Sequence, residues 1–174
     1  MPSLNMAKFK AMVHYIIEHS SVESLGMAKL HKILWFADSE AYLNFKATIS
    51  GETYIKKIDG PVSKNLDAAL EALVQDKLIT VSEQEGEPKH ILHSMAAPDM
   101  SSLNKQELSI LYEQIVRIRP MSADEAINLS RDYTWRIHDD DEEIDIRVVQ
   151  ITPLEVTHET LEWALSAMQH RQGL

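Results

Sequence analysis

The sequence contains no cysteine, and this absence excludes several kinds of chemistry at once. Without a thiol the chain can form neither a disulfide bond nor a thiolate metal site, and it has no cysteine nucleophile. Only five glycines are scattered over the 174 residues, too few for a Gly-rich phosphate-binding loop. The G-x-S-x-G nucleophile elbow and the H-E-x-x-H zinc motif are also missing. The sequence therefore predicts a protein that is not an enzyme and that uses no cofactor or metal.

Long hydrophobic runs are absent as well. No stretch approaches the ~20 consecutive apolar residues that a membrane-spanning helix requires. The first seventeen residues are apolar on one helical face only, and Lys8, Lys10 and His14 interrupt any signal-peptide core. We therefore expect a cytoplasmic protein with no membrane partner.

The chain has fewer basic than acidic residues. The chain carries 17 Lys and Arg against 27 Asp and Glu, which gives a net charge of −10. Because binding to nucleic acid depends on clustered Lys and Arg at the phosphates, this balance argues against a nucleic-acid partner. The hydrophobic fraction of 44% and the charged fraction of 25% are ordinary globular values. Length and composition together predict one domain over residues 1–174.

The spacing of apolar residues predicts a chain that is mainly helical. Helices are expected over residues 5–19, 27–45, 64–77, 104–118, 123–131 and from 152 to about 171. Ser63 is the expected N-cap of the third helix, and Ser122 with Glu125 forms a capping box for the fifth. The helix over 27–45 is apolar nearly all round, so it should be central. Lys29, Lys32 and Asp38 are expected on the small part of this helix's surface that stays exposed to solvent.

Short apolar, β-branched runs predict strands over residues 53–58, 78–82 and 89–95, and an extended piece over 144–151. The order helix, strand, turn, strand over residues 64–95 is the layout of a winged helix. A three-stranded sheet is one arrangement that these runs allow. The predicted fold class is therefore mainly α with a small antiparallel β-sheet (α+β), a helical domain with a winged-helix-like hairpin.

Two groups of His and carboxylate side chains could be metal ligands. His14 and Glu18 lie one helical turn apart, but no third ligand is evident, so a solvated polar pair is the preferred interpretation. Residues 139–145 hold six carboxylates in seven positions, yet lack the Gly and the spaced terminal Glu of a calcium-binding EF-hand loop. A solvated acidic loop is preferred there, and a surface that faces a basic partner remains the alternative.

One stretch carries a recognisable order of motifs. Residues 29–38 read KLHKILWFAD, followed by GETY at 51–54, GPV at 60–62, LEAL at 70–73 and LI at 78–79. This stretch, residues 29–79, resembles the Panacea domain of the SocA-like antitoxins, which belong to bacterial and phage toxin–antitoxin pairs. The first segment is similar to that family's K-L-x-K-L-L-Y-F-A-D helix. The Ser and Trp that the family often shows near its C-terminal part are matched by Ser130 and Trp135, whereas Tyr133 or Thr134 stands where a His is expected.

The resemblance implies an antitoxin that neutralises a partner toxin by protein–protein contact, or presents it to a protease. The toxin is expected to be encoded by the adjacent gene. The candidates for a partner surface, or for motif roles such as a polar network beneath it and a shaped turn, are Lys29, Lys32, Asp38, Tyr54, Gly60 and Pro61. The alternative is a winged-helix DNA-binding transcriptional regulator, with residues 64–77 as its recognition helix. An enzyme that uses scattered His and carboxylates ranks last.

Overall fold

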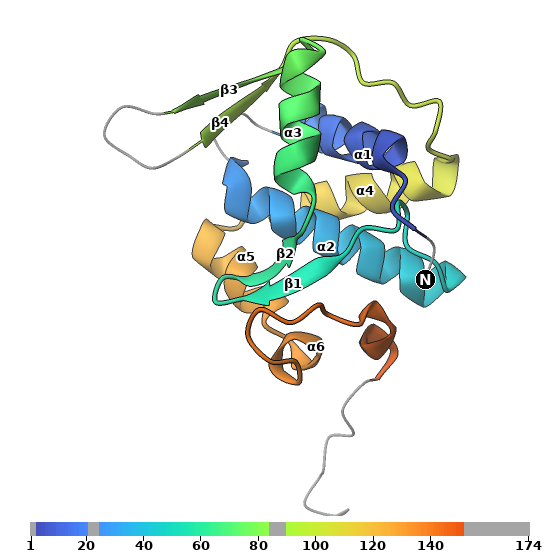
Figure 1. Ribbon diagram of the computed structural model, residues 1–174, viewed down its shortest axis with the longest axis vertical. Helices are drawn as coiled ribbons and strands as arrows, with labels where there is room; N and C mark the ends of the chain where they lie inside the picture. Colours follow the sequence, from blue (N-terminus) through green and yellow to red (C-terminus); the bar gives the residue numbers. More distant parts are fainter. Residues whose placement is uncertain (1–2, 21–24, 84–89, 152–174) are drawn as a thin grey trace, which may run out of the picture.

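Helix α2 (Gly26–Phe45) lies at the centre of the fold, as its apolar run predicted (Figure 1). The computed structural model describes residues 3–20, 25–83 and 90–151. Around α2 pack α1 (Met6–His19), α4 (Lys105–Ile118) and α5 (Ala123–Ser130). Ile33, Leu34, Trp35 and Ala37 of α2 are almost fully buried, so the core is built along this helix.

The helix boundaries follow local capping chemistry. The Asn5 side chain accepts a hydrogen bond from the backbone N–H of Lys8 and starts α1. A capping box joins Asn104 to Glu107 at the start of α4, and the predicted box of Ser122 and Glu125 starts α5. The predicted ranges for these three helices are confirmed to within one residue at each end.

The strands form two separate antiparallel hairpins. Strand β1 (Tyr54–Lys57) pairs with β2 (Gly60–Ser63), and β3 (Ile79–Glu83) pairs with β4 (His90–Ser94). The described residues therefore do not form the three-stranded sheet that these runs allowed. The edge of β1 is instead taken by residues 141–144, through hydrogen bonds from Ile144 N–H to the Tyr54 carbonyl and from Lys56 N–H to the Glu142 carbonyl.

Helix α3 (Leu66–Gln75) precedes β3 and β4, so the predicted order helix, strand, strand is observed, and the β3–β4 hairpin projects from the body of the molecule (Figure 1). The predicted start of α3 was wrong, because Ser63 belongs to β2. Asn65 occupies the N-cap position, and its backbone N–H donates to the Glu52 carboxylate at 3.0 Å. The buried carboxylate of Glu52, in the loop before β1, thus takes the place of a capping side chain at the start of α3.

After α5 the chain forms the short helix α6 (Tyr133–Arg136) and the 3-10 helix η1 (Ile146–Gln150). The extended conformation expected over 144–151 was wrong for 146–150, because the Asp145 side chain accepts from the Arg147 N–H and starts η1. The helix predicted from residue 152 lies outside the described residues. The fold class, mainly α with small antiparallel sheets, is confirmed. Within the described ranges, none of the helices is long and apolar enough to cross a membrane.

Candidate functional site

The polar motif residues of α2 are buried, which corrects the expectation that they lie on its remaining surface. The exposed fraction is 6% for Lys29, 1% for Lys32 and 0% for Asp38. Burying a charged group without a partner costs several kcal/mol, so each of these side chains needs a polar partner inside the protein. The partners are backbone groups and side chains of the elements that surround α2.

Asp38 joins α2 to the loop before β1 and to β1 itself. Its Oδ1 accepts the backbone N–H of Ile49 at 2.8 Å, and its Oδ2 accepts the Tyr54 hydroxyl at 2.7 Å. Burial raises the pKa of the Asp38 carboxyl to about 7, although these two hydrogen bonds lower it. Burial, with the nearby Asp38 carboxylate, also raises the pKa of Tyr54. The Tyr54 ring meets the Trp35 ring edge-on at 5.1 Å between centroids.

Lys32 joins α2 to the start of β2. Its Nζ donates to the Pro61 carbonyl at 2.8 Å, and burial lowers its pKa to about 8 despite the charge of Asp59. Gly60 has a φ of +87° and packs so closely that a Cβ added there would lie 2.3 Å from Ser130 Oγ and 3.1 Å from Lys32 Nζ. Only glycine fits this junction of α2, β2 and α5 without displacing a neighbour.

Two further polar contacts fix α2 at its N-terminal half. Lys29 Nζ donates to the Arg119 carbonyl at 2.9 Å, at the end of α4. His31 Nδ1 accepts the backbone N–H of Ser63 at 3.1 Å, and burial lowers the pKa of His31 to about 4, so the ring is neutral at neutral pH. His31 was not among the predicted site residues, although the KLHK run contains it. Its partner on β2 could not be inferred from that run.

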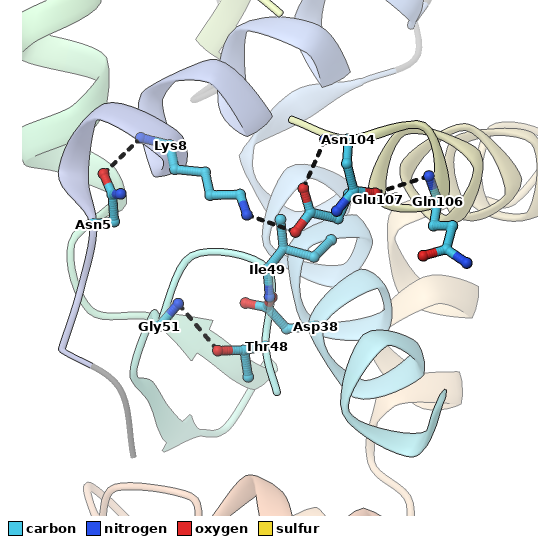
Figure 2. A network of polar contacts seen from close by, with 9 residues as sticks. All are labelled: Asn5, Lys8, Asp38, Thr48, Ile49, Gly51, Asn104, Gln106 and Glu107. Carbon is cyan, nitrogen blue, oxygen red and sulfur yellow. Dashed lines mark hydrogen bonds and ion pairs between the residues drawn. The ribbon is translucent and has the colours of Figure 1, made fainter. Parts of the chain in front are cut away.

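A second polar network connects α1 to α4 beside the same loop (Figure 2). Lys8 Nζ pairs with the Glu107 carboxylate at 2.5 Å, and Glu107 also closes the capping box with Asn104. The backbone N–H of Asn5 donates to the Ser50 carbonyl at 2.8 Å, next to the residue that Asp38 binds. The loop between α2 and β1 is therefore held from both sides.

His14 is buried, and its Nε2 lies 3.0 Å from Ser94 Oγ on β4. Burial lowers the pKa of His14. The expectation of a solvated pair with Glu18 was therefore wrong for the histidine, which instead joins α1 to the hairpin. Within the described part of the chain, no three His, Asp or Glu side chains gather as metal ligands.

The acidic segment, residues 139–145, lies against basic side chains of its own chain. Lys56 pairs with Asp140 at 3.4 Å, Lys64 pairs with Glu143 at 2.6 Å, and Lys57 pairs with Asp141. The carboxylates remain mostly exposed, as the preferred interpretation of a solvated loop predicted. The basic surface that faces this segment is thus the β1 strand and the residue after β2.

Trp135 lies against the same hairpin. Its Nε1 donates to the Lys57 carbonyl at 2.9 Å, and Lys56 Nζ lies 4.5 Å from the centre of its ring. Arg131 donates to the Ile58 carbonyl in the turn of the hairpin and faces the ring from further away. The matched Ser130 and Trp135 therefore both contact the β1–β2 hairpin, one from inside and one from outside.

These contacts describe a mainly helical α+β scaffold in which the six motif residues make separate contacts around α2: Asp38 with Tyr54, Lys32 with the Gly60–Pro61 turn, and Lys29 with the end of α4. Gly60 allows Ser130 and Lys32 to approach the backbone closely, and Pro61 supplies the carbonyl that Lys32 binds. The other four residues are buried and carry polar side-chain groups. The family model described as antitoxin SocA-like, Panacea domain, matches residues 30–136. This span is more than half of the chain, and the protein belongs to that family. No curated protein and no solved structure matches the chain.

Proposed function

We propose that this protein is an antitoxin that neutralises a partner toxin by binding it. The observation that carries the proposal is the family match over residues 30–136, which covers most of α2, both hairpins and the helices up to α6. The net charge of −10 supports a basic protein partner better than nucleic acid. In this proposal the motif residues build the polar network beneath the surface, and the partner meets the exposed faces that this network holds in place.

The proposal is tested by expressing the adjacent gene with and without this protein in the same cells. Expression of that gene alone should arrest growth, and co-expression should restore growth and yield a complex that co-purifies. A Leu73→Asp variant, which places a charge at a buried core position, should fail to restore growth. Growth arrest that wild-type protein does not relieve would contradict the proposal.

The same experiment separates binding alone from presentation to a protease. If binding alone neutralises the toxin, its half-life should be unchanged or longer in the presence of the antitoxin. If the antitoxin presents the toxin to a protease, the half-life should shorten, and the effect should disappear in a strain that lacks the protease.

A DNA-binding regulator is the second candidate, because α3, β3 and β4 follow one another as in a winged helix. Helix α3 carries Asp67 and Glu71 at exposed positions, and a helix that enters a DNA groove should instead present Lys and Arg. A gel shift with promoter DNA at low salt distinguishes the two functions. Sequence-specific retention of that DNA would favour the regulator.

A further inference from the structure

An open groove lies between α3 and the β3–β4 hairpin. It has a volume of about 440 Å³, and α3 forms one wall of it. Met27, at the start of α2, and Leu70 contribute to its apolar lining, and Val74 and Val81 face it from α3 and β3. Val74 and Val81 are each 41% exposed, so apolar surface from two elements meets solvent in one place. Apolar side chains that line a groove, with a few polar groups at its edge, are the usual composition of a binding site.

The rim of the groove is acidic. Asp67 and Glu71 lie on the exposed side of α3, one helical turn apart. Across the described residues, no ion pair neutralises either carboxylate. The segment over 139–145 differs in this respect, because Lys56, Lys57 and Lys64 already pair with it. On α3, two carboxylates without an ion pair among the described residues therefore lie beside an apolar surface.

We infer that this groove is the docking site for a basic, apolar segment of the partner toxin. Aliphatic or aromatic side chains of that segment pack against Val74 and Val81, and its Lys or Arg side chains pair with Asp67 and Glu71. A cationic partner fits because complementary charge both steers association and excludes wrong partners. This inference rests on the proposed antitoxin function and assigns it a surface.

Two pairs of matched variants test the groove. Val74→Glu places a charge on the apolar wall, and Val116→Glu makes the same change at a valine on α4 that is 43% exposed. Glu71→Lys reverses a charge on the rim, and Glu113→Lys does so at an exposed glutamate on α4. All four sites are solvent-exposed on helices, so far-UV circular dichroism and the thermal midpoint should remain close to those of wild type.

The probe is the purified product of the adjacent gene, titrated against each variant. Val74→Glu and Glu71→Lys should each weaken binding at least tenfold, whereas Val116→Glu and Glu113→Lys should change it less than twofold. Raising the salt concentration should weaken wild-type binding more than that of Glu71→Lys, because one ion pair is already lost in the variant.

The possible results distinguish a failure of the proposed docking groove from a failure of the proposed antitoxin function. If wild-type protein neither binds the probe nor relieves growth arrest, the antitoxin function fails and the inference fails with it. If wild type binds but the two groove variants bind equally well, the function stands and the groove is the wrong surface. A wild-type dimer that Val74→Glu converts to a monomer, with probe binding intact, would assign the groove to self-association and overturn the inference.

Discussion

Asp38 is a carboxyl group that is fully buried and has no cation hydrogen-bonded to it among the described residues. Its two donors are an amide and a phenol, which stabilise the ionised form less than a guanidinium would. Desolvation therefore dominates, and the pKa rises from 3.8 to about 7. The Asp38 side chain on the central helix thus gains or loses its proton near neutral pH, within the range in which the protein can be studied.

The first prediction concerns Asp38→Asn. Between pH 4 and pH 7 the folded state holds a proton on Asp38 that the unfolded state has lost, so this residue's contribution to the free energy of unfolding falls as pH rises. Each unit of pKa shift corresponds to about 1.4 kcal/mol. The stability of wild type relative to Asp38→Asn should therefore decline by a few kcal/mol across this window, as measured by urea denaturation at several pH values.

His31 titrates in the opposite sense, because its lowered pKa makes stability rise with pH between about 4 and 6.5. It is present in both proteins, however, and its effect cancels in the difference between them. Asp124→Asn, at an exposed position in the first turn of α5, is the control. Parallel pH profiles for wild type and Asp38→Asn would show that Asp38 is ionised throughout and would contradict the prediction.

Among the six motif residues, Gly60 is the one with a positive φ. A side chain there meets two separate costs, a φ of +87° and the contact with Ser130 Oγ at 2.3 Å. Gly60→Ala should lower the free energy of unfolding by about 2–4 kcal/mol, from roughly 1–2 kcal/mol of backbone strain and the remainder from overpacking. Chemical denaturation measures the loss.

The double variant Gly60→Ala/Ser130→Ala separates these two costs. Removing Ser130 Oγ relieves the steric contact but leaves the positive φ, so about half of the loss should be recovered relative to Ser130→Ala alone. Additive losses, with no recovery, would show that the contact with Ser130 is not the source of the cost.

At the scale of elements, the acidic segment is held to β1 by two kinds of contact. Its ion pairs with Lys57 and Lys64 are exposed, and water and salt screen such pairs, so they contribute little to stability. Ile144, by contrast, is 5% exposed, and its N–H donates to the Tyr54 carbonyl. The burial of Ile144 therefore contributes more than the exposed ion pairs to the stability of the contact between this segment and β1.

The corresponding prediction compares Ile144→Ala with Asp141→Asn. The isoleucine truncation should cost about 2–4 kcal/mol, because it leaves a cavity against β1. The loss of the Asp141 charge should cost less than 1 kcal/mol and should become undetectable at high salt. Thermal unfolding at low and high ionic strength provides both comparisons. An Asp141→Asn loss as large as that of Ile144→Ala would mean that the charges hold the segment.

These elements also show what the sequence could and could not predict. Local signals sufficed for α1, α4 and α5, where Asn5, Asn104 and Ser122 cap the helix that directly follows. The predicted start of α3 failed because its carboxylate partner, Glu52, lies in another segment. The edge pairing of β1 with 141–144 joins residues about 90 positions apart, and no local pattern indicates such pairing.

The burial of Lys29, Lys32 and Asp38 was missed for a related physical reason. A lysine in a helix is ordinarily a surface residue, and it is buried only when a polar acceptor lies at the end of its side chain. The acceptors here are the carbonyls of Arg119 and Pro61, which tertiary packing brings to α2. The apolar run from Ile33 to Ala37 did indicate a helix covered on several sides, and this property makes the neighbouring polar residues internal.

At the scale of the whole molecule, α2 packs against α1, α4, α5, β2 and β4, so both hairpins depend on one helix. We therefore propose a single domain and predict that it unfolds as one cooperative unit. In a Trp135→Phe/Trp163→Phe variant, Trp35 is the remaining tryptophan and reports on the buried face of α2. Its fluorescence and the far-UV circular dichroism should show the same denaturation midpoint, because the helices that produce the dichroism share one core. A dichroism change that precedes the Trp35 signal would instead reveal a part of the chain that unfolds independently of α2.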